Sequence, residues 1–341
     1  MTPDKRKTTA AWVSVASNSG LIAAKVVVGT IIGSVSVISE AIHSGVDLLA
    51  AVIALLAVRE SSKPADERHP YGHGKFENIS GTVEAVLIFV AAGWIVYKAG
   101  KKFVHPAEIT PGWGVAVMLV SALVNWRVSR MLFRVGKETD SIALQADGWH
   151  LRTDVWTSAG VMAGLGLIWA GDIIVANIGG LAPARRDAIQ KALHWIDPIA
   201  AILVAGLIVK AAWELTVRSA RDLMDVQWPP EEEAWLREML KTLGPSVHGF
   251  HRIRTRKSGA DRFVELHIFV EAAMTVEESH RLSHEIGQRV QEHFSNAGHS
   301  HVLVHVEPCA GRCDEQGCRA GCLLDESVRQ AIRQRRQDEL P

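Results

Sequence analysis

Apolar residues recur in runs of 18 or more along the first two thirds of the chain, whereas the last third is rich in Arg, Glu and His. Runs of this length predict helices that cross a lipid bilayer, because about 20 residues span its hydrocarbon core. Six spans are expected, over residues 10–32, 37–58, 79–99, 112–133, 146–171 and 195–216. The pattern therefore predicts an integral, multi-pass membrane protein with an all-α membrane domain and a soluble domain after it.

Positively charged residues flank these spans unevenly. About fourteen Lys and Arg lie on the side that holds both termini, against about six on the other side. Since cytoplasmic loops carry the excess of positive charge, the N- and C-termini are expected in the cytoplasm, with the protein in the plasma (inner) membrane. The formal net charge of the chain is zero and gives no sign of a nucleic-acid partner.

The soluble part alternates between helical and strand periodicity. Helices are predicted over 231–243 and 276–294, and strands over 247–258, 261–272 and 299–308. The order αββαβ indicates a small two-layer α+β domain.

Three divisions follow from these patterns. They are a six-span membrane domain over residues 1–225, a cytoplasmic domain over 226–308 and a tail over 309–341, which is expected to be mobile. The tail holds all the cysteines of the chain, at Cys309, Cys313, Cys318 and Cys322. Their spacing differs from the C-x2-C of common zinc sites, so two interpretations remain open: a soft metal bound by thiolates, or a reduced tail without that role.

Two of the predicted spans repeat a His-x-x-x-Asp pattern, at His43 and Asp47 in the second and at His150 and Asp154 in the fifth. Residues four apart share one face of a helix, so two facing helices would bring two imidazoles and two carboxylates together. Such a tetrahedral set of nitrogen and oxygen ligands suits Zn²⁺. The alternative for a single pair is a hydrogen-bonded couple that fixes helix packing. A duplicated set of ionisable groups at membrane depth favours the metal site, because each group costs at least about 2.5 kcal/mol on insertion.

Asp147 lies one turn before His150 and shares its face. Either it orients the imidazole of His150 as a partner behind the metal ligands, or it is a carboxylate that favours the start of a helix.

The segment between the second and third spans holds Asp66, His69 and His73 among Pro and Gly residues. Pro and Gly force a turn here, so these three side chains can converge without a helix and form a loop metal site.

Taken together, HSGVD, DGWHLRTD, HPYGHGKFE and VHVEPC resemble the cation diffusion facilitator family of divalent-metal/proton antiporters over roughly residues 10–308. The resemblance implies that His43, Asp47, His150 and Asp154 form the transport site, and that Asp66, His69 and His73 form a second site. The two-histidine, two-aspartate version resembles the zinc-preferring members, while others transport cadmium, iron or manganese. Residues 171–198 depart from the family pattern, because they are longer than its usual turn between the last two spans.

The resemblance also implies a homodimer with a metallochaperone-like cytoplasmic domain. In that domain it implies a binuclear metal site, with ligands at His251, His267, His280, His305 and Glu307. It further implies that Lys75 pairs with an acid after the last span, here Asp225, and so interlocks the protomers near the membrane surface.

Ligand chemistry predicts the exchange of metal for protons. Binding Zn²⁺ requires neutral imidazoles and ionised carboxylates, so metal entry expels protons and protonation displaces metal. Fe²⁺, Co²⁺, Cd²⁺ and Mn²⁺ remain alternatives, because availability also decides which metal is bound. The rival classes are a membrane hydrolase or di-iron oxidase and a passive metal sensor. The spans lack an HExxH motif, which disfavours the enzyme, and one span would be enough to anchor a sensor.

Overall fold

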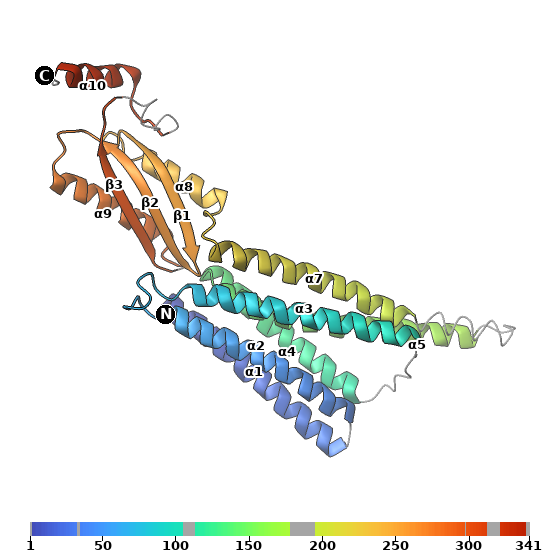
Figure 1. Cartoon of the computed structure of the whole chain (residues 1–341). Helices are drawn as coiled ribbons and strands as arrows, with labels where there is room; N and C mark the ends of the chain where they lie inside the picture. Colours follow the sequence, from blue (N-terminus) through green and yellow to red (C-terminus); the bar gives the residue numbers. More distant parts are fainter. Residues whose placement is uncertain are drawn as a thin grey trace. The chain divides into compact units, whose positions relative to one another are not determined.

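The computed structural model describes residues 2–32, 35–104, 113–177, 195–296, 298–311 and 321–338. The chain forms two compact units, Met1–Ala220 and Arg221–Pro341 (Figure 1).

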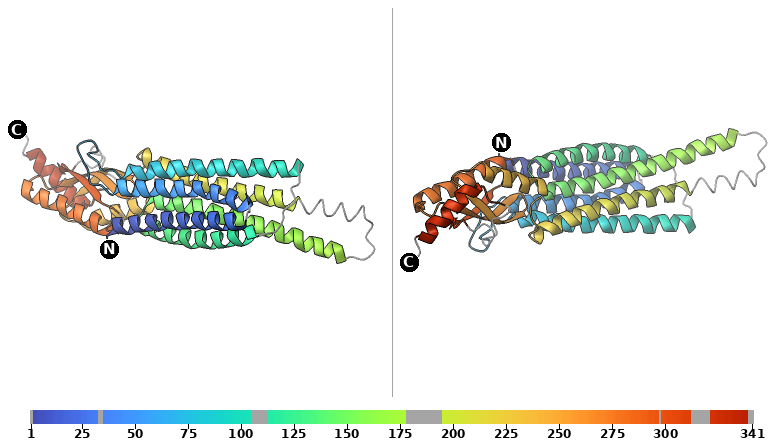
Figure 2. Two further views of the ribbon diagram at one scale, coloured as in Figure 1. Left: turned by 90° about the horizontal axis from the view of Figure 1, so that it is seen from below. Right: turned by 90° about the horizontal axis from the view of Figure 1, so that it is seen from above.

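The first unit consists of long helices. These are α1 (Pro3–Ile32), α2 (Val35–Ser61), α3 (Lys75–Val104), α4 (Trp113–Glu138), α5 (Ile142–Asn177) and α7 (Ile196–Leu223). They run side by side as a bundle in all three views (Figures 1 and 2). Among the described residues, three stretches are long and apolar enough to cross a membrane by length and composition: Pro3–Ile31, Lys75–Lys101 and Pro198–Leu223. The number of apolar spans found among the described residues is therefore lower than the six that the sequence predicts, although a helix covers all or nearly all of each predicted range.

Small side chains fill the interior of this bundle. Ala10, Ala57 and Ala143 belong to one buried cluster, and Ala85 and Ala146 to another. Large apolar side chains such as those of Val90, Leu203 and Trp213 lie on the outside instead. This is the arrangement of helices in a bilayer, where small residues let the backbones approach and lipid surrounds the apolar exterior. Close helix approach is what brings polar side chains of α2 and α5 together.

The second unit is an α+β domain. It contains α8 (Pro230–Lys241), β1 (Gly249–Ser258), β2 (Asp261–Val270), α9 (Val276–His293), β3 (Ser300–Pro308) and α10 (Glu326–Asp338). The sheet has the order β1-β2-β3, with β1 and β2 antiparallel and β2 and β3 parallel. The αββαβ order predicted from the sequence is confirmed.

The helices α8 and α9 cover one face of this sheet. Val264, Leu266 and Ile268 of β2 pack with Leu282 and Ile286 of α9 in the buried core. Because side chains alternate along a strand, residues such as His267 and Phe269 project to the opposite face. The face without these two helices is therefore the one that carries the histidines of the strands.

Described residues of the tail form α10 and contact the sheet, and the mobility of the tail stays a prediction. Cys309 is buried beside Phe269 in a small cluster that Ile332 of α10 joins, and Cys322 forms an isolated bridge with Gly249. A few apolar contacts are enough to hold α10 here, although its sequence is rich in charge. Cys313 and Cys318 lie outside the described residues, as do positions 178–194 of the long segment 171–198.

Candidate metal centres

The first candidate centre lies inside the helix bundle, where α2 meets α5. Among the described residues, Asp47, His150 and Asp154 place one ligand atom each within 4.8 Å of the others. The Nε2 atom of His150 lies 3.1 Å from Oδ1 of Asp47, and these two residues are only 4% and 5% exposed. His43 belongs to α2, four residues before Asp47, but its side chain lies outside the described part of the structure.

The helical repeat explains this convergence. Residues four apart on α5 turn His150 and Asp154 to one side, and α2 supplies Asp47 from the facing side. Two carboxylates and an imidazole inside a helix bundle are a set that binds a divalent cation, since buried charges require a partner of opposite charge.

The second candidate centre lies in the turn between α2 and α3. Oδ1 of Asp66 is 3.2 Å from Nδ1 of His69, and Oδ2 is 3.3 Å from Nε2 of His73. The backbone amides of His69 and Arg68 donate to the Asp66 carboxylate, and these bonds hold its pKa below the usual value. The turn therefore keeps Asp66 ionised.

One histidine of this turn is held from both sides. Nδ1 of His73 lies 3.1 Å from the carbonyl oxygen of Pro64, which can only accept a hydrogen bond. Nδ1 therefore donates to Pro64, and Nε2 is the ring nitrogen that faces Asp66. Gly72 supports the turn with a φ of 81°, a conformation that glycine adopts without strain.

The third candidate centre lies on the face of the sheet opposite α8 and α9. His251, His267 and Glu307 bring ligand atoms within 4.8 Å of one another. Nδ1 of His267 is 2.6 Å from Oε1 of Glu307, and Nε2 of His251 is 3.3 Å from Oε2. The strand register places them together, because His251 pairs with His267 and Phe269 pairs with Glu307.

Two pKa shifts prepare this centre for metal. Burial lowers the pKa of His251 against the opposing effect of Glu307, so the imidazole is neutral near neutral pH. Burial acts to raise the pKa of Glu307, but the hydrogen bond with His267 and the charge that His251 carries when it is protonated outweigh it, and the pKa is lowered. A neutral imidazole and an ionised carboxylate are the forms that bind metal.

The other two predicted ligands of the soluble domain differ from each other in position. His305 of β3 pairs with His267, and their rings lie 4.6 Å apart. His280 belongs to α9, where its ring lies 4.6 Å from that of His284 and is exposed. Because α9 packs on the opposite face of the sheet, the fold does not bring His280 to the centre within one protomer.

The predicted interlock joins residues of different units. Lys75 is the first residue of α3, and Asp225 follows α7 with its carboxylate 3.5 Å from Arg256. The pairing of Lys75 with Asp225 stays a prediction.

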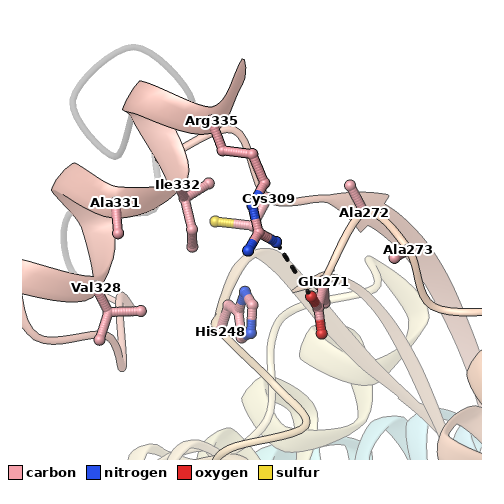
Figure 3. Close-up of a pocket in the computed structure, with 9 residues that line it drawn as sticks. All are labelled: His248, Glu271, Ala272, Ala273, Cys309, Val328, Ala331, Ile332 and Arg335. Atoms are coloured by element: carbon pink, nitrogen blue, oxygen red, sulfur yellow. Dashed lines mark ion pairs between the residues drawn. The ribbon is translucent and has the colours of Figure 1, made fainter. Parts of the chain in front are cut away.

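A surface pocket of about 540 Å³ separates α10 from the end of the sheet (Figure 3). His248, Glu271 and Cys309 line it, and Arg335 of α10 lies 4.0 Å from Glu271. His, Glu and Cys are residue types that bind metals. However, His248, Glu271 and Cys309 are not among the three groups of described residues whose ligand atoms lie within 4.8 Å of one another.

Buried acidic side chains of the bundle also lie outside the set of predicted site residues. Glu84 of α3 is fully buried and lies near Asp147. The signal is visible in the sequence TVEAVLIFV, where one carboxylate interrupts an apolar span.

Helices of a membrane bundle with buried metal ligands, joined to an α+β domain, define a class of membrane transporters for metal cations. The family of the cation efflux transmembrane domain matches residues 11–224, and that of the cation efflux protein cytoplasmic domain matches residues 228–309. The chain therefore belongs to the cation efflux, or cation diffusion facilitator, family. It is a transporter and not an enzyme.

Two relatives are similar to this chain over most of its length. An uncharacterised transporter of Synechocystis is 32% identical over 279 residues, which cover 82% of this chain and 83% of the relative. The cation-efflux pump FieF of Escherichia coli is 28% identical over 302 residues, with coverage of 88% and 92%. A solved structure described as a candidate zinc transporter, CzrB, is 32% identical, covers 24% of this chain and 98% of its own, and has a TM-score of 0.22.

Proposed function

We propose that this protein exports divalent cations, most favourably Zn²⁺, from the cytoplasm in exchange for protons. The observation that supports this proposal most directly is the group of metal-ligand side chains formed by Asp47, His150 and Asp154. We propose that His43 completes this group to a tetrahedral set. Two imidazoles and two carboxylates match zinc better than the all-oxygen sites that magnesium or calcium prefers. Fe²⁺, Co²⁺, Cd²⁺ and Mn²⁺ would compete for the same ligands.

Protons would drive the transport through these same ligands. The site binds metal only when its imidazoles are neutral and its carboxylates ionised, so a proton flux from outside displaces the ion. Alternating exposure of the site to the two sides of the inner membrane then converts inward proton flow into metal efflux.

The proposed roles are assigned to the domains predicted from the sequence. Residues 1–225 would cross the membrane six times, with both termini in the cytoplasm, and residues 226–308 would dimerise. Lys75 and Asp225 would interlock the protomers. The loop centre would collect ions, and the centre at His251, His267 and Glu307, with His305 and with His280 from the dimer, would sense cytoplasmic metal.

Reconstituted vesicles with an imposed pH gradient test this proposal. We expect zinc uptake by the parent protein and none by Asp47→Asn or Asp154→Asn. Glu214→Gln is the matched control, because it makes the same change at an exposed carboxylate of α7. Gradient-independent uptake, or equal uptake by all four proteins, would contradict the antiport mechanism.

A further inference from the structure

Two carboxylates of the bundle are not part of the proposed transport site. Glu84 of α3 and Asp147 of α5 are both 0% exposed. Their chain neighbours Ala85 and Ala146 pack in one buried cluster of α3 and α5, and the charge of Asp147 acts on Glu84. A fully buried pair of like charges is unfavourable unless something positive or a proton lies between the two groups.

In the described part of the structure, no positively charged side chain offsets the charge of Glu84. The side chains that act on Glu84 there are Asp147 and Ser80, and Ser80 donates a hydrogen bond of 3.3 Å to Oε1. The other oxygen, Oε2, has no hydrogen-bond partner among the described residues. Glu84 is therefore left with one donor and an unused carboxylate oxygen.

Asp147 is similarly short of partners. Among the described residues, neither of its oxygens accepts a hydrogen bond of normal geometry, and the Nδ1 atom of His150 is also unpartnered. Asp147 therefore does not orient His150 through a hydrogen bond, which was one of the two interpretations of its position. The charged groups that act on Asp147 are His150 and Asp47, besides its interaction with Glu84.

A hydroxyl group from a third helix lies beside Asp147. Ser14 of α1 is 0% exposed and lies near the carboxylate of Asp147, yet its oxygen makes no hydrogen bond of normal geometry within the described residues. Unpartnered polar atoms of α1 and α3 on either hand of the unpartnered Asp147 carboxylate mark a place for water or a hydrated ion.

The pair also has a defined place along the bundle. Glu84 lies seven residues after Glu77, or about 10 Å along α3, and Asp147 lies one turn before His150 in α5. At the start of the helices, Glu77 and Lys7 form a buried ion pair of 3.2 Å, and Ser61 donates to Glu77 at 2.9 Å. The order from the helix ends inward is thus this ion pair, the two carboxylates and then the transport group.

We propose that Glu84 and Asp147, with the hydroxyl of Ser14, form a second divalent-cation site, which holds the transported ion partly hydrated before it reaches Asp47, His150 and Asp154. This inference rests on the proposed transport function. An all-oxygen set without an imidazole suits a six-coordinate ion that keeps water ligands, whereas the inner group suits a tetrahedral one. The ion would lose its water in two steps as it moves inward.

The zinc dependence of flux in vesicles that contain the full chain is the first test. We expect Glu84→Gln and Asp147→Asn to raise the half-saturating zinc concentration by about 10-fold and to leave the maximal rate nearly unchanged, because a loading site contributes to binding. Glu214→Gln is the control and should behave as the parent. Parental zinc dependence in both variants would overturn the proposal.

A binding measurement separates this proposal from the transport function. The purified full chain with Asp47→Asn and Asp154→Asn is titrated with Co²⁺, and bound metal is counted with and without Glu84→Gln. The count should fall by one ion per chain with Glu84→Gln and should not change with Glu214→Gln. An unchanged count overturns the second site, even if the parent transports nothing.

Two further outcomes are interpretable. If the metal count is unchanged but the pH dependence of flux shifts, the pair carries protons and the metal site is overturned. If Glu84→Gln fails to elute as the parent oligomer, Glu84→Asp replaces it. This variant keeps the carboxylate, and we expect it to retain the ion with weaker affinity, whereas parental affinity would contradict the site.

Discussion

The bundle centre and the sheet centre use the same kinds of ligand in opposite surroundings. Asp47 and His150 are nearly inaccessible, and both come from helices. Glu307 and His267 retain about a quarter of their side-chain exposure, at 26% and 25%, and come from strands. A helix places ligands four residues apart on one face, whereas a strand places them two apart.

This difference in burial separates two tasks. A centre enclosed among helices releases its ion only when the helices move, as carrying an ion across a membrane requires. A centre on an open sheet face exchanges its ion with the surrounding water and follows its concentration, as sensing requires. In the proposed function the first centre carries metal and the second responds to it.

The largest expected effect is on transport through the bundle centre. Asp154→Asn should reduce zinc flux by at least about 100-fold, because it removes a charged ligand from a closed coordination set. Metal binding by the sheet centre should not change. Flux assays in vesicles test the loss of transport, and a metal titration of the same preparation tests binding at the sheet centre. Loss of that binding in Asp154→Asn would contradict the independence of the two centres.

A substitution in the sheet centre should show the opposite pattern of flux and metal binding. Glu307→Gln removes the carboxylate shared by His251 and His267, so the affinity of the sheet centre should weaken by about 10–100-fold. The maximal flux at saturating zinc should persist, because the bundle centre is intact. Abolished flux would assign a carrying role to the sheet centre.

Acid should weaken the sheet centre through two groups acting in the same direction. The pKa values of Glu307 and His251 are both lowered in the folded protein, so their ionised and neutral forms, respectively, are favoured there. Their contribution to stability is present above their ordinary values of about 4.3 and 6.5 and is lost as pH falls through the lowered values. Protons also compete with metal for these two side chains as pH falls toward the lowered pKa values. Metal affinity should therefore be nearly constant between pH 7 and about 6.5 and should decrease at lower pH. Calorimetric titrations at several pH values measure this.

The smallest effect is expected at the loop centre. Asp66 and His69 have side chains that are 53% and 45% exposed, so water competes with any bound ion. His69→Ala should change flux by less than about 3-fold, because an exposed charge pair contributes little. Asp66→Asn provides a comparison at the same turn. A loss of flux as large as that of Asp154→Asn would make the loop a required part of the path.

The sequence predicted the elements and the ligand pairs well where a local repeat sets them. Apolar runs and strand alternation located the helices and β1 to β3, and the spacing of His150 and Asp154 placed both on one helix face. Each of these depends only on residues close in the chain.

Features that depend on contacts distant in sequence were not predictable in this way. Glu84 is one carboxylate in an apolar helix, and only the packing of α3 against α5 shows that it faces Asp147. The docking of α10 depends on the contact of Ile332 with Cys309 and Phe269, which its charged sequence conceals. His280 lies on the helix layer because α9 turns Leu282 and Ile286 toward the sheet.

Zinc-driven proton movement, recorded by a pH dye inside vesicles, tests the central claim most directly. Zinc addition should move protons in the opposite direction with the parent and with Glu307→Gln, and should move none with Asp154→Asn. Proton movement that survives in Asp154→Asn, or zinc flux by the parent without any proton movement, would contradict the assignment of antiport to the bundle centre.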